Sequence, residues 1–291
     1  MKWIARGCLL DQAGTVRGVW RKTPAGPKRL LRWPAIALLA ATTACGGPVS
    51  AAPDAGDASP LPPPPEPQSS ATAFAGLSSA GVLLDKDGEH FCSASVVDSP
   101  KGNVIATAAH CVFEYGSYME NVTFAPSFSG AGAGKTPYGR WKVRAIQVDA
   151  RWRADTEDSD TVDYAFVTLE PDAKGRNVQD VVGGTPVDWT AVPARRVTVV
   201  GYPNPDHNPD NRPIACTTDT EPDPELAGSV RMDCSGFWDG TSGGPWLAGY
   251  RDPKHPGRLI GVTSGGDTDS VSTAVRFNAN ARKLYDKAAK Q

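Results

Sequence analysis

The sequence predicts an all-β protein that follows an export signal and a spacer and that ends in one helix. From about Phe74 onward, short runs of apolar and β-branched residues are separated by clusters of Gly, Pro, Asn and Asp. The runs alternate in polarity or are apolar throughout, as the strands of sandwiches and barrels are. The predicted strands are residues 80–84, 93–97, 104–108, 122–124, 141–148, 165–169, 196–201 and 259–263.

Residues 1–45 are predicted to be the export signal. A basic stretch, residues 21–32, precedes an apolar run, residues 33–41, that is too short to span a bilayer as a helix. A basic region, a short apolar region and small residues after it are typical of a secretory signal. The run as an uncleaved anchor is one alternative.

The cleavage point of this signal has two interpretations. Cys45 follows Thr-Thr-Ala and resembles the lipoprotein box of bacteria, in which the cysteine receives lipid, although the usual Leu three positions earlier is missing. Residues 49–51, Val-Ser-Ala, form an ordinary small-residue cleavage site. The first interpretation predicts a lipid-anchored protein at the outer face of the membrane, and the second predicts a freely secreted one.

Residues 46–73 are predicted to be a disordered linker, with a short pro-segment as the alternative. The stretch has no large aromatic residue and almost no branched aliphatic residue, so it cannot bury enough apolar area to offset its chain entropy. Its four consecutive prolines, residues 62–65, favour an extended polyproline II conformation.

Residues 74–291 are predicted to form the folded domain, which we expect to be monomeric. Its end should be a helix, because apolar residues recur there at helical spacing and Asn278 or Asn280 can cap the first turn. The apolar positions of this helix are Phe277, Ala281, Leu284, Tyr285 and Ala288.

The charge distribution argues against a nucleic-acid partner. Beyond Ala44 the chain has 22 basic and 31 acidic residues, a net charge of −9. An acidic body of this kind repels nucleic acid and anionic membrane surfaces. We therefore expect contact with a membrane only through a lipid on Cys45.

Four cysteines lie in the predicted domain: Cys92, Cys111, Cys216 and Cys234. An even number in an exported protein indicates disulfides, and three pairings are open. The sequential pairing closes two short loops, each worth about 3 kcal/mol on a chain-entropy basis. There is no Cys-x-x-Cys spacing and no accompanying histidine cluster, so we expect neither a metal nor a cofactor.

Three short motifs contain the residues suited to acyl transfer, which needs a nucleophile, a base, a group that orients the base, and donors for the oxyanion. Ser242 lies between glycines in GTSGGP, where the amides of Gly240 and Ser242 can point at one oxygen. His110 lies among small residues in TAAHC, and Asp163 begins the apolar run DYAFV. An acid there can hold the imidazole tautomer and stabilise the imidazolium. The other histidines, in polar surroundings, are expected at the surface: His90, His207 and His255.

Together the three motifs resemble the serine endopeptidases of the chymotrypsin fold. TAAHC, DYAFV and GTSGGP occur in the order His, Asp, Ser, separated by 53 and 79 residues. The longer segments FCSASVV, GRWKVRAIQVDARW, VVGYP and CSGFWDGTSGGPWL resemble secreted trypsin-like peptidases of actinobacteria. The resemblance extends from about Phe74 to the C-terminus.

The resemblance implies two six-stranded antiparallel β-barrels with an active site between them. His110 and Asp163 would come from the first barrel and Ser242 from the second. The family's disulfide beside the catalytic histidine corresponds to Cys92–Cys111. Substrate would be a peptide or protein, bound along a strand that contains Thr263, Ser264, Gly265 and Gly266.

Two positions depart from the digestive trypsins. The acid that precedes their nucleophile, and that receives the new N-terminus after zymogen cleavage, is replaced here by Thr241. The acid that selects Arg or Lys, six residues before the nucleophile, is replaced by Gly236. We therefore expect no activation through that switch and no trypsin-like basic specificity, although Asp239 at the pocket rim could favour a positive or small side chain.

Two other functions remain to be weighed against the peptidase. A catalytically silent binding protein on the same fold would not need the full set of triad residues and oxyanion glycines. An esterase that uses Gly-x-Ser-x-Gly would place its acid and histidine after the serine, whereas His110 and Asp163 precede Ser242.

Overall fold

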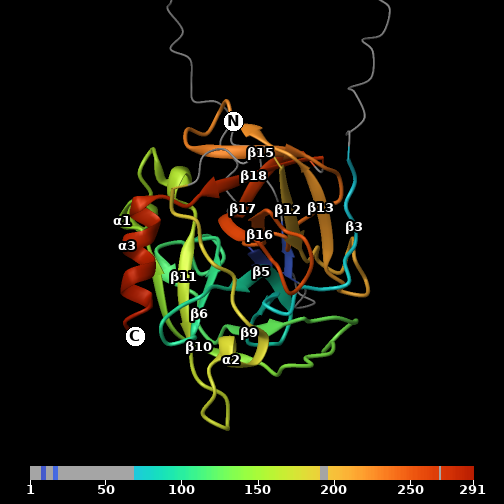
Figure 1. The fold of residues 1–291 in the computed structure, drawn as a ribbon, viewed down its shortest axis with the longest axis vertical. Helices are drawn as coiled ribbons and strands as arrows, with labels where there is room; N and C mark the ends of the chain where they lie inside the picture. The colour runs from blue at the N-terminus through green and yellow to red at the C-terminus, as the bar shows by residue number, and fades with distance from the viewer. Residues whose placement is uncertain (1–7, 11–15, 19–68, 191–195, 269) are drawn as a thin grey trace, which may run out of the picture. The chain divides into compact units, whose positions relative to one another are not determined.

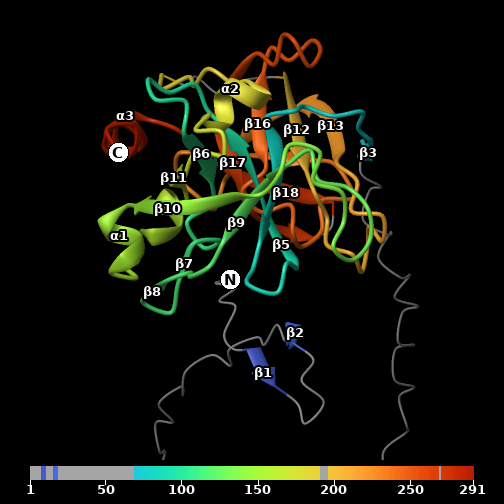
Figure 2. The same ribbon diagram turned by 90° about the horizontal axis from the view of Figure 1, so that it is seen from below.

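A computed structural model describes residues 8–10, 16–18, 69–190, 196–268 and 270–291. The chain divides into two units, residues 1–61 and 62–291. In the first unit, β1 (Cys8–Leu10) pairs antiparallel with β2 (Val16–Gly18), as Figure 2 shows. The predicted signal run 33–41, Cys45 and residues 46–68 of the predicted linker lie outside the described residues. No helix within the described ranges combines the length and the apolar character needed to cross a membrane.

The first half of the larger unit is a closed antiparallel barrel of six strands (Figure 1). Its strand order is β10-β11-β6-β5-β4-β9, so that every strand has two neighbours. Closure removes the exposed edges that would otherwise template pairing with another chain. The strands are β4 (Ala80–Leu84), β5 (His90–Val96), β6 (Val104–Thr107), β9 (Thr123–Pro126), β10 (Trp141–Val148) and β11 (Ala165–Leu169).

The second half is an antiparallel sheet of eight strands that does not close by hydrogen bonding. Its order is β14-β15-β18-β17-β16-β12-β13-β3, and the edge strands β14 and β3 have two residues each. The predicted all-β class is confirmed, with a closed six-stranded barrel and, in place of a second six-stranded barrel, a half-barrel sheet of eight strands whose short edge strands do not pair with each other. The strands are β3 (Thr72–Ala73), β12 (Arg196–Gly201), β13 (Ile214–Asp219), β14 (Glu221–Pro222), β15 (Ser229–Asp233), β16 (Pro245–Ala248), β17 (Arg258–Thr268) and β18 (Val271–Arg276).

The two halves share an apolar core. Tyr164 and Phe166, at the start of the β11 segment, pack in one buried cluster with Val200 of β12, Leu247 of β16 and Phe277. The rings of Tyr164 and Phe277 meet edge to face with centroids 5.8 Å apart. Because burying large aromatic side chains contributes strongly to stability, this shared cluster fixes one half against the other.

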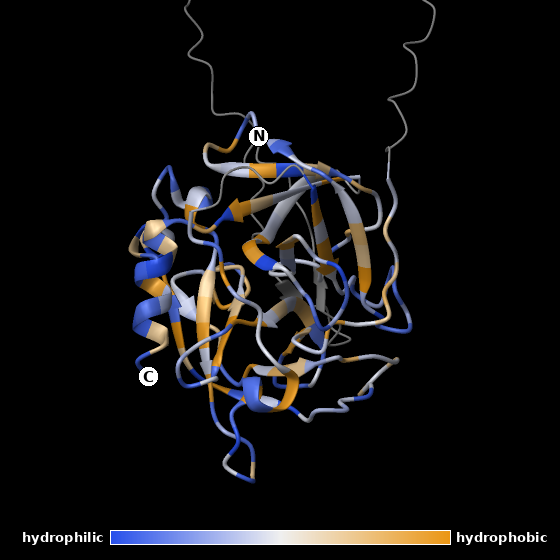
Figure 3. Ribbon diagram, viewed as in Figure 1, coloured by the Kyte–Doolittle hydropathy of each residue, from blue (hydrophilic) through white to orange (hydrophobic). Residues whose placement is uncertain are grey.

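The predicted C-terminal helix is confirmed as α3 (Ala279–Ala288), which lies against β10 and β11 (Figure 1). Asn278 is the cap, since its side chain accepts hydrogen bonds from the backbone N–H groups of Asn280 and Ala281 at 2.9 and 3.2 Å. Apolar and polar residues alternate around the helix in Figure 3. The helix buries Ala281, Leu284 and Ala288.

Short elements lie between the barrel strands. A hairpin of β7 (Phe113–Glu114) and β8 (Ser117–Tyr118) follows β6, and α1 (Ala150–Arg153) follows β10. A 3₁₀ turn (Ser159–Val162) leads into Asp163, and α2 (Val178–Val182) follows β11.

The boundary expected between linker and domain lies earlier than residue 74. Thr72 and Ala73 pair with Ala215 and Ile214 of β13, and the backbone N–H of Ala71 donates to the carbonyl of Ser235 at 2.9 Å. Residues 69–73, Ser-Ser-Ala-Thr-Ala, have only small side chains and so no clear strand pattern, but the edge of β13 offers them unpaired backbone groups.

Both sequential disulfides are confirmed. Cys92–Cys111 joins β5 to the loop after β6, and Cys216–Cys234 joins β13 to the residue after β15. Their Cα–Cα distances are 6.1 and 6.7 Å, within the usual range for a disulfide.

Candidate active site

His110 and Asp163 meet at the same end of two neighbouring strands. β6 runs into the loop that contains His110, and Asp163 stands directly before Tyr164 and β11. Because Thr107 of β6 pairs with Ala165 of antiparallel β11, the end of one strand lies beside the start of the other. The Cys92–Cys111 disulfide then holds the residue after His110 against β5.

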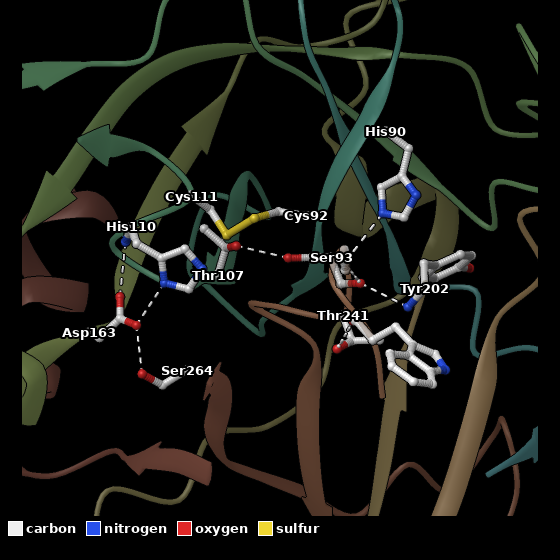
Figure 4. The surroundings of a disulfide bond; sticks show 12 residues. His90, Cys92, Ser93, Thr107, His110, Cys111, Asp163, Tyr202, Thr241 and Ser264 are labelled. Atoms are coloured by element: carbon white, nitrogen blue, oxygen red, sulfur yellow. Dashed lines mark hydrogen bonds and ion pairs between the residues drawn. A yellow bond between two sulfur atoms is a disulfide. The ribbon is translucent and has the colours of Figure 1, made fainter. Parts of the chain in front are cut away.

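Two hydrogen bonds join the pair, as Figure 4 shows. Asp163 Oδ2 lies 2.8 Å from His110 Nδ1, and Asp163 Oδ1 accepts from the backbone N–H of His110 at 2.9 Å. The carboxylate is buried, with 4% of its side chain exposed, while the imidazole is 31% exposed. Asp163 therefore fixes both the position and the tautomer of a histidine whose other nitrogen can face a substrate.

Each member of the His110–Asp163 pair shifts the pKa of the other so that its charged form is favoured. Burial acts to lower the pKa of His110, but the carboxylate of Asp163, with further contributions from Glu114 and Asp239, raises it above its ordinary value. Burial acts to raise the pKa of Asp163, but His110 and the hydrogen bonds from Ser264 and the His110 amide hold it below its ordinary value. Asp163 is thus an anion that stabilises the protonated imidazole.

Ser264 of β17 connects this pair to the second half. Its hydroxyl donates to Asp163 Oδ2 at 2.6 Å, on the same oxygen that faces His110 (Figure 4). The preceding residue, Thr263, exchanges backbone hydrogen bonds with the turn that contains Ser242. Gly243 N–H donates to the Thr263 carbonyl at 2.7 Å, and Thr263 N–H donates to the Gly244 carbonyl at 2.9 Å.

The turn that contains Ser242 also packs directly against the loop of His110. Ser93 N–H donates to the Ser242 carbonyl at 2.7 Å, and Gly243 has φ +80°. A Cβ on Gly243 would collide with Thr107 Oγ1 and the Ser93 carbonyl and would lie 3.0 Å from the amide nitrogen of Ala108. Only glycine fits this approach, which brings Ser242 beside the segment that leads into His110.

Ser242, His110 and Asp163 are therefore gathered in one region, with one hydrogen bond of the expected series unmade. No hydrogen bond links Ser242 Oγ to His110 Nε2 among the bonds of the described residues. In unliganded peptidases this contact is often long and shortens when substrate binds.

The backbone around Ser242 alternates in direction. The carbonyl of Asp239 accepts from Asn204 N–H at 2.7 Å, and the carbonyl of Thr241 accepts from Gly244 N–H at 2.9 Å. Because a trans peptide is planar, the N–H groups of Gly240 and Ser242 point away from these anchored carbonyls. Neither N–H donates a hydrogen bond within the described part of the chain, whereas the N–H of Thr241 between them donates to Trp238 O at 3.1 Å.

Thr241 is buried and secures the turn from inside. Its hydroxyl donates to the Trp238 carbonyl at 2.8 Å, and its side chain fits against Gly201 of β12. A threonine at this position makes local hydrogen bonds where an acid would require a buried cation.

The residues expected to line the substrate site occupy different environments. Thr263 is buried and its hydroxyl accepts from Trp246 Nε1 at 2.9 Å, whereas Gly265 and Gly266 are exposed on β17. Gly236 has φ +99°, and a Cβ there would lie 3.3 Å from Ala71 of the N-terminal segment. Asp239 is exposed, near enough to His110 for its charge to raise that pKa.

The expectation for the remaining histidines is partly wrong. His207 and His255 are exposed as expected, and His207 stacks on Trp238 with ring centroids 4.0 Å apart. His90, in contrast, is buried as the first residue of β5, with 9% of its surface exposed. His90 is the first residue of the strand HFCSASV and shares a face with Cys92 and Ala94, so the alternation of the strand could have indicated its burial.

Comparisons with known proteins agree with this fold. A family model described as Trypsin matches residues 69–286. The crystal structure of protease Anisep from Arthrobacter nicotinovorans superposes with a TM-score of 0.67 at 24% identity, over 76% of this chain and 100% of that one. The thermostable serine protease AL20 from an extremophilic microorganism superposes with a TM-score of 0.64 at 26% identity, over 74% of this chain and 98% of that one. None of the curated proteins compared with the chain matches it.

The fold and the family match define a serine-type endopeptidase with a chymotrypsin-like fold. The chain belongs to the trypsin family.

Proposed function

We propose that Ser242, His110 and Asp163 are the catalytic triad of this endopeptidase and that the amides of Gly240 and Ser242 form its oxyanion hole. The observation that carries the proposal is the series of contacts from His110 through Asp163, Ser264 and Thr263 to the turn of Ser242. This series connects a positioned base to a serine in a turn where two backbone N–H groups, those of Gly240 and Ser242, donate no hydrogen bond within the described residues.

The proposed reaction follows from this arrangement. His110 Nε2 takes the proton of Ser242 Oγ as the oxygen attacks the peptide carbonyl, while Asp163 stabilises the imidazolium through Nδ1. The carbonyl oxygen gains negative charge, which the amides of Gly240 and Ser242 stabilise. His110 then gives its proton to the leaving amine, which leaves an acyl-enzyme on Ser242. In the second half of the reaction, His110 takes a proton from water as the water attacks the acyl carbonyl, and then returns it to Ser242 Oγ as the acid product leaves.

Labelling with a fluorophosphonate tests the nucleophile. The serine oxygen displaces fluoride from phosphorus, so wild-type protein should label at Ser242 and Ser242→Ala should not. Ser235→Ala is the matched control, because Ser235 lies seven residues upstream and its hydroxyl donates to Ser70 Oγ at 2.8 Å, away from the histidine. Folded wild-type protein that never labels, and that cleaves no peptide, would overturn the proposal.

The specificity should differ from that of digestive trypsin. Gly236 supplies no carboxylate, and its missing side chain faces Ala71. Asp239 is the acidic group nearest to the proposed nucleophile in sequence and is exposed. Mapping the cuts in a peptide library should show no strict requirement for Arg or Lys before the scissile bond. A preference for acidic side chains would contradict the role given to Asp239.

We also propose that the protein works outside the cytoplasm as a monomer. Two disulfides favour an oxidising compartment, and one chain supplies the whole triad. Mass spectrometry of the mature N-terminus distinguishes a lipid-modified Cys45 from cleavage after residue 51. Light scattering after gel filtration tests the monomer.

A further inference from the structure

The carbonyl of Gly240 is held from behind by two side chains. Ser93 Oγ donates to it at 2.9 Å, and His90 Nε2 lies 3.3 Å from it. A carbonyl can only accept, so the contact is a hydrogen bond when His90 Nε2 carries the imidazole hydrogen. Both side chains come from β5 of the barrel, whereas Gly240 belongs to the turn of Ser242 in the other half.

The surroundings of His90 favour a neutral ring. Burial lowers the pKa of His90, with the hydrogen bonds to Asn211 and Gly240 opposing that effect only in part. The ring edge faces Tyr202, with centroids 6.3 Å apart, and Nδ1 lies 2.9 Å from Asn211 Oδ1. A neutral ring has one N–H and cannot donate to both Asn211 Oδ1 and the Gly240 carbonyl. We assign the Asn211 amide with its NH₂ group, in place of Oδ1, toward Nδ1, so that Nε2 carries the hydrogen and donates to Gly240.

This double contact matters because Gly240 is a flexible link between two peptide planes. Its φ of +92° is open to glycine, and a Cβ there would lie 2.8 Å from both Asn204 N and Tyr202 O. Asn204 anchors the plane before Gly240 through the Asp239 carbonyl, and His90 and Ser93 anchor the plane after it. With both planes fixed, the Gly240 N–H keeps one direction.

We propose that His90 is a positioning residue for the oxyanion hole, holding the Gly240 carbonyl so that the Gly240 amide faces the substrate. The inference rests on the proposed function of Gly240 and Ser242. It also explains how the turn keeps its shape with Thr241 in place of an acid, since the ties come from β5 and not from a new N-terminus.

Two substitutions of His90 separate this role from a general role in packing. The amide nitrogen of Gln reaches the place of Nε2, so His90→Gln keeps a donor for the Gly240 carbonyl. The amide of Asn reaches only the place of Nδ1, so His90→Asn keeps a partner for Asn211 and loses that donor. His255→Asn, at an exposed histidine paired with Asp252, is the control.

Kinetics on a peptide amide substrate give the first readout. We expect kcat of His90→Asn to fall roughly 10- to 100-fold with KM nearly unchanged, less than the 10²- to 10³-fold loss for removing an oxyanion donor outright. His90→Gln should recover most of kcat. Affinity for a peptidyl trifluoromethyl ketone, which forms an oxyanion on Ser242, should fall in step with kcat, while affinity for the product peptide should not.

The outcomes are distinct. Equal kcat for the Gln and Asn variants, or a loss expressed only in KM, would overturn the role of His90. Wild-type protein that neither labels nor cleaves would overturn the proposed function instead. If His90→Asn does not fold, Ser93→Ala removes the other donor to the same carbonyl. A folded Ser93→Ala protein should then show the kcat loss, and unchanged kcat would count against the inference.

Discussion

The two sides of the candidate active site are held by different chemistry. On the barrel side, His110 is fixed by the carboxylate of Asp163 and by the neighbouring Cys92–Cys111 disulfide. On the sheet side, Ser242 lies in a turn whose carbonyls, together with the amides of Thr241, Gly243 and Gly244, are held by hydrogen bonds. Side-chain chemistry places the proposed base, and main-chain geometry places the proposed nucleophile. The two sides should therefore fail in different ways when they are altered.

The largest effect should come from the barrel side, by Asp163→Asn. An amide at this place can donate to Nδ1, which then holds no hydrogen, so the proton moves to Nε2 and His110 can no longer accept one from Ser242. We expect kcat to fall about 10⁴-fold with the fold intact. Steady-state kinetics measure the loss, and a decrease of less than about tenfold would remove Asp163 from the proposed triad.

On the sheet side, Gly240→Ala should act through the backbone. A Cβ at φ +92° would press on Asn204 and Tyr202 and turn the Gly240 amide away from the substrate. We expect a loss of roughly 10²- to 10³-fold in kcat. Gly249→Ala is the control, because Gly249 also has a positive φ of +71° but has open space where the Cβ would go. The control therefore has the same kind of backbone strain but displaces no neighbouring residue. Equal kcat for the two variants would contradict the oxyanion assignment.

The two disulfides provide a matched comparison of stability. They span 19 and 18 residues, so the chain-entropy loss should be about 3 kcal/mol for either Cys→Ser pair. Only the pair Cys92→Ser/Cys111→Ser should also lower kcat, because Cys111 follows His110. Urea unfolding gives the first quantity, and kinetics in the absence of urea give the second. A kcat loss on removing Cys216 and Cys234 alone would break the comparison.

The smallest effect should be a change in pH dependence from Glu114→Gln. The charge of Glu114 helps to raise the pKa of His110, and His110 acts as a base only when it is neutral. Activity is lost as the pH falls through the pKa of His110, so removing Glu114 should move this acid limb of kcat/KM to lower pH. Glu157→Gln, in an exposed loop, should leave it in place. A shift to higher pH would contradict the contribution of Glu114.

The sequence predicted the barrel side better than the sheet side, for a physical reason. TAAHC and DYAFV place a titratable residue at the end of an apolar strand, and pairing of those strands is enough to bring His110 and Asp163 together. The sheet side depends on contacts between distant backbones. The motif GTSGGP predicted a tight turn, but neither the ties of Asn204 and His90 nor the bond from Ser264 to Asp163 leaves a local pattern.

The contrast between local sequence patterns and distant backbone contacts also explains where the predicted fold differs from the structure. Periodicity predicted most strands and the helix α3, because each depends on its own alternation of apolar residues. Residues 69–73 have no large apolar side chain, and β3 forms within them because β13 offers an unpaired edge. Whether a sheet closes depends in the same way on the lengths of its outermost strands, β14 and β3 here.

The hydrogen bonds around the turn of Ser242 all come from residues 90–264 of the same folded unit. If this turn is the oxyanion hole, no contact among the described residues holds it in an inactive shape, and it takes its working shape as this unit folds. Low peptidase activity inside the producing cell would then depend on when the domain finishes folding relative to export. If the two disulfides form only after export from the reducing cytoplasm, the domain becomes fully rigid only outside the cell, where it cannot cleave the proteins of the cytoplasm.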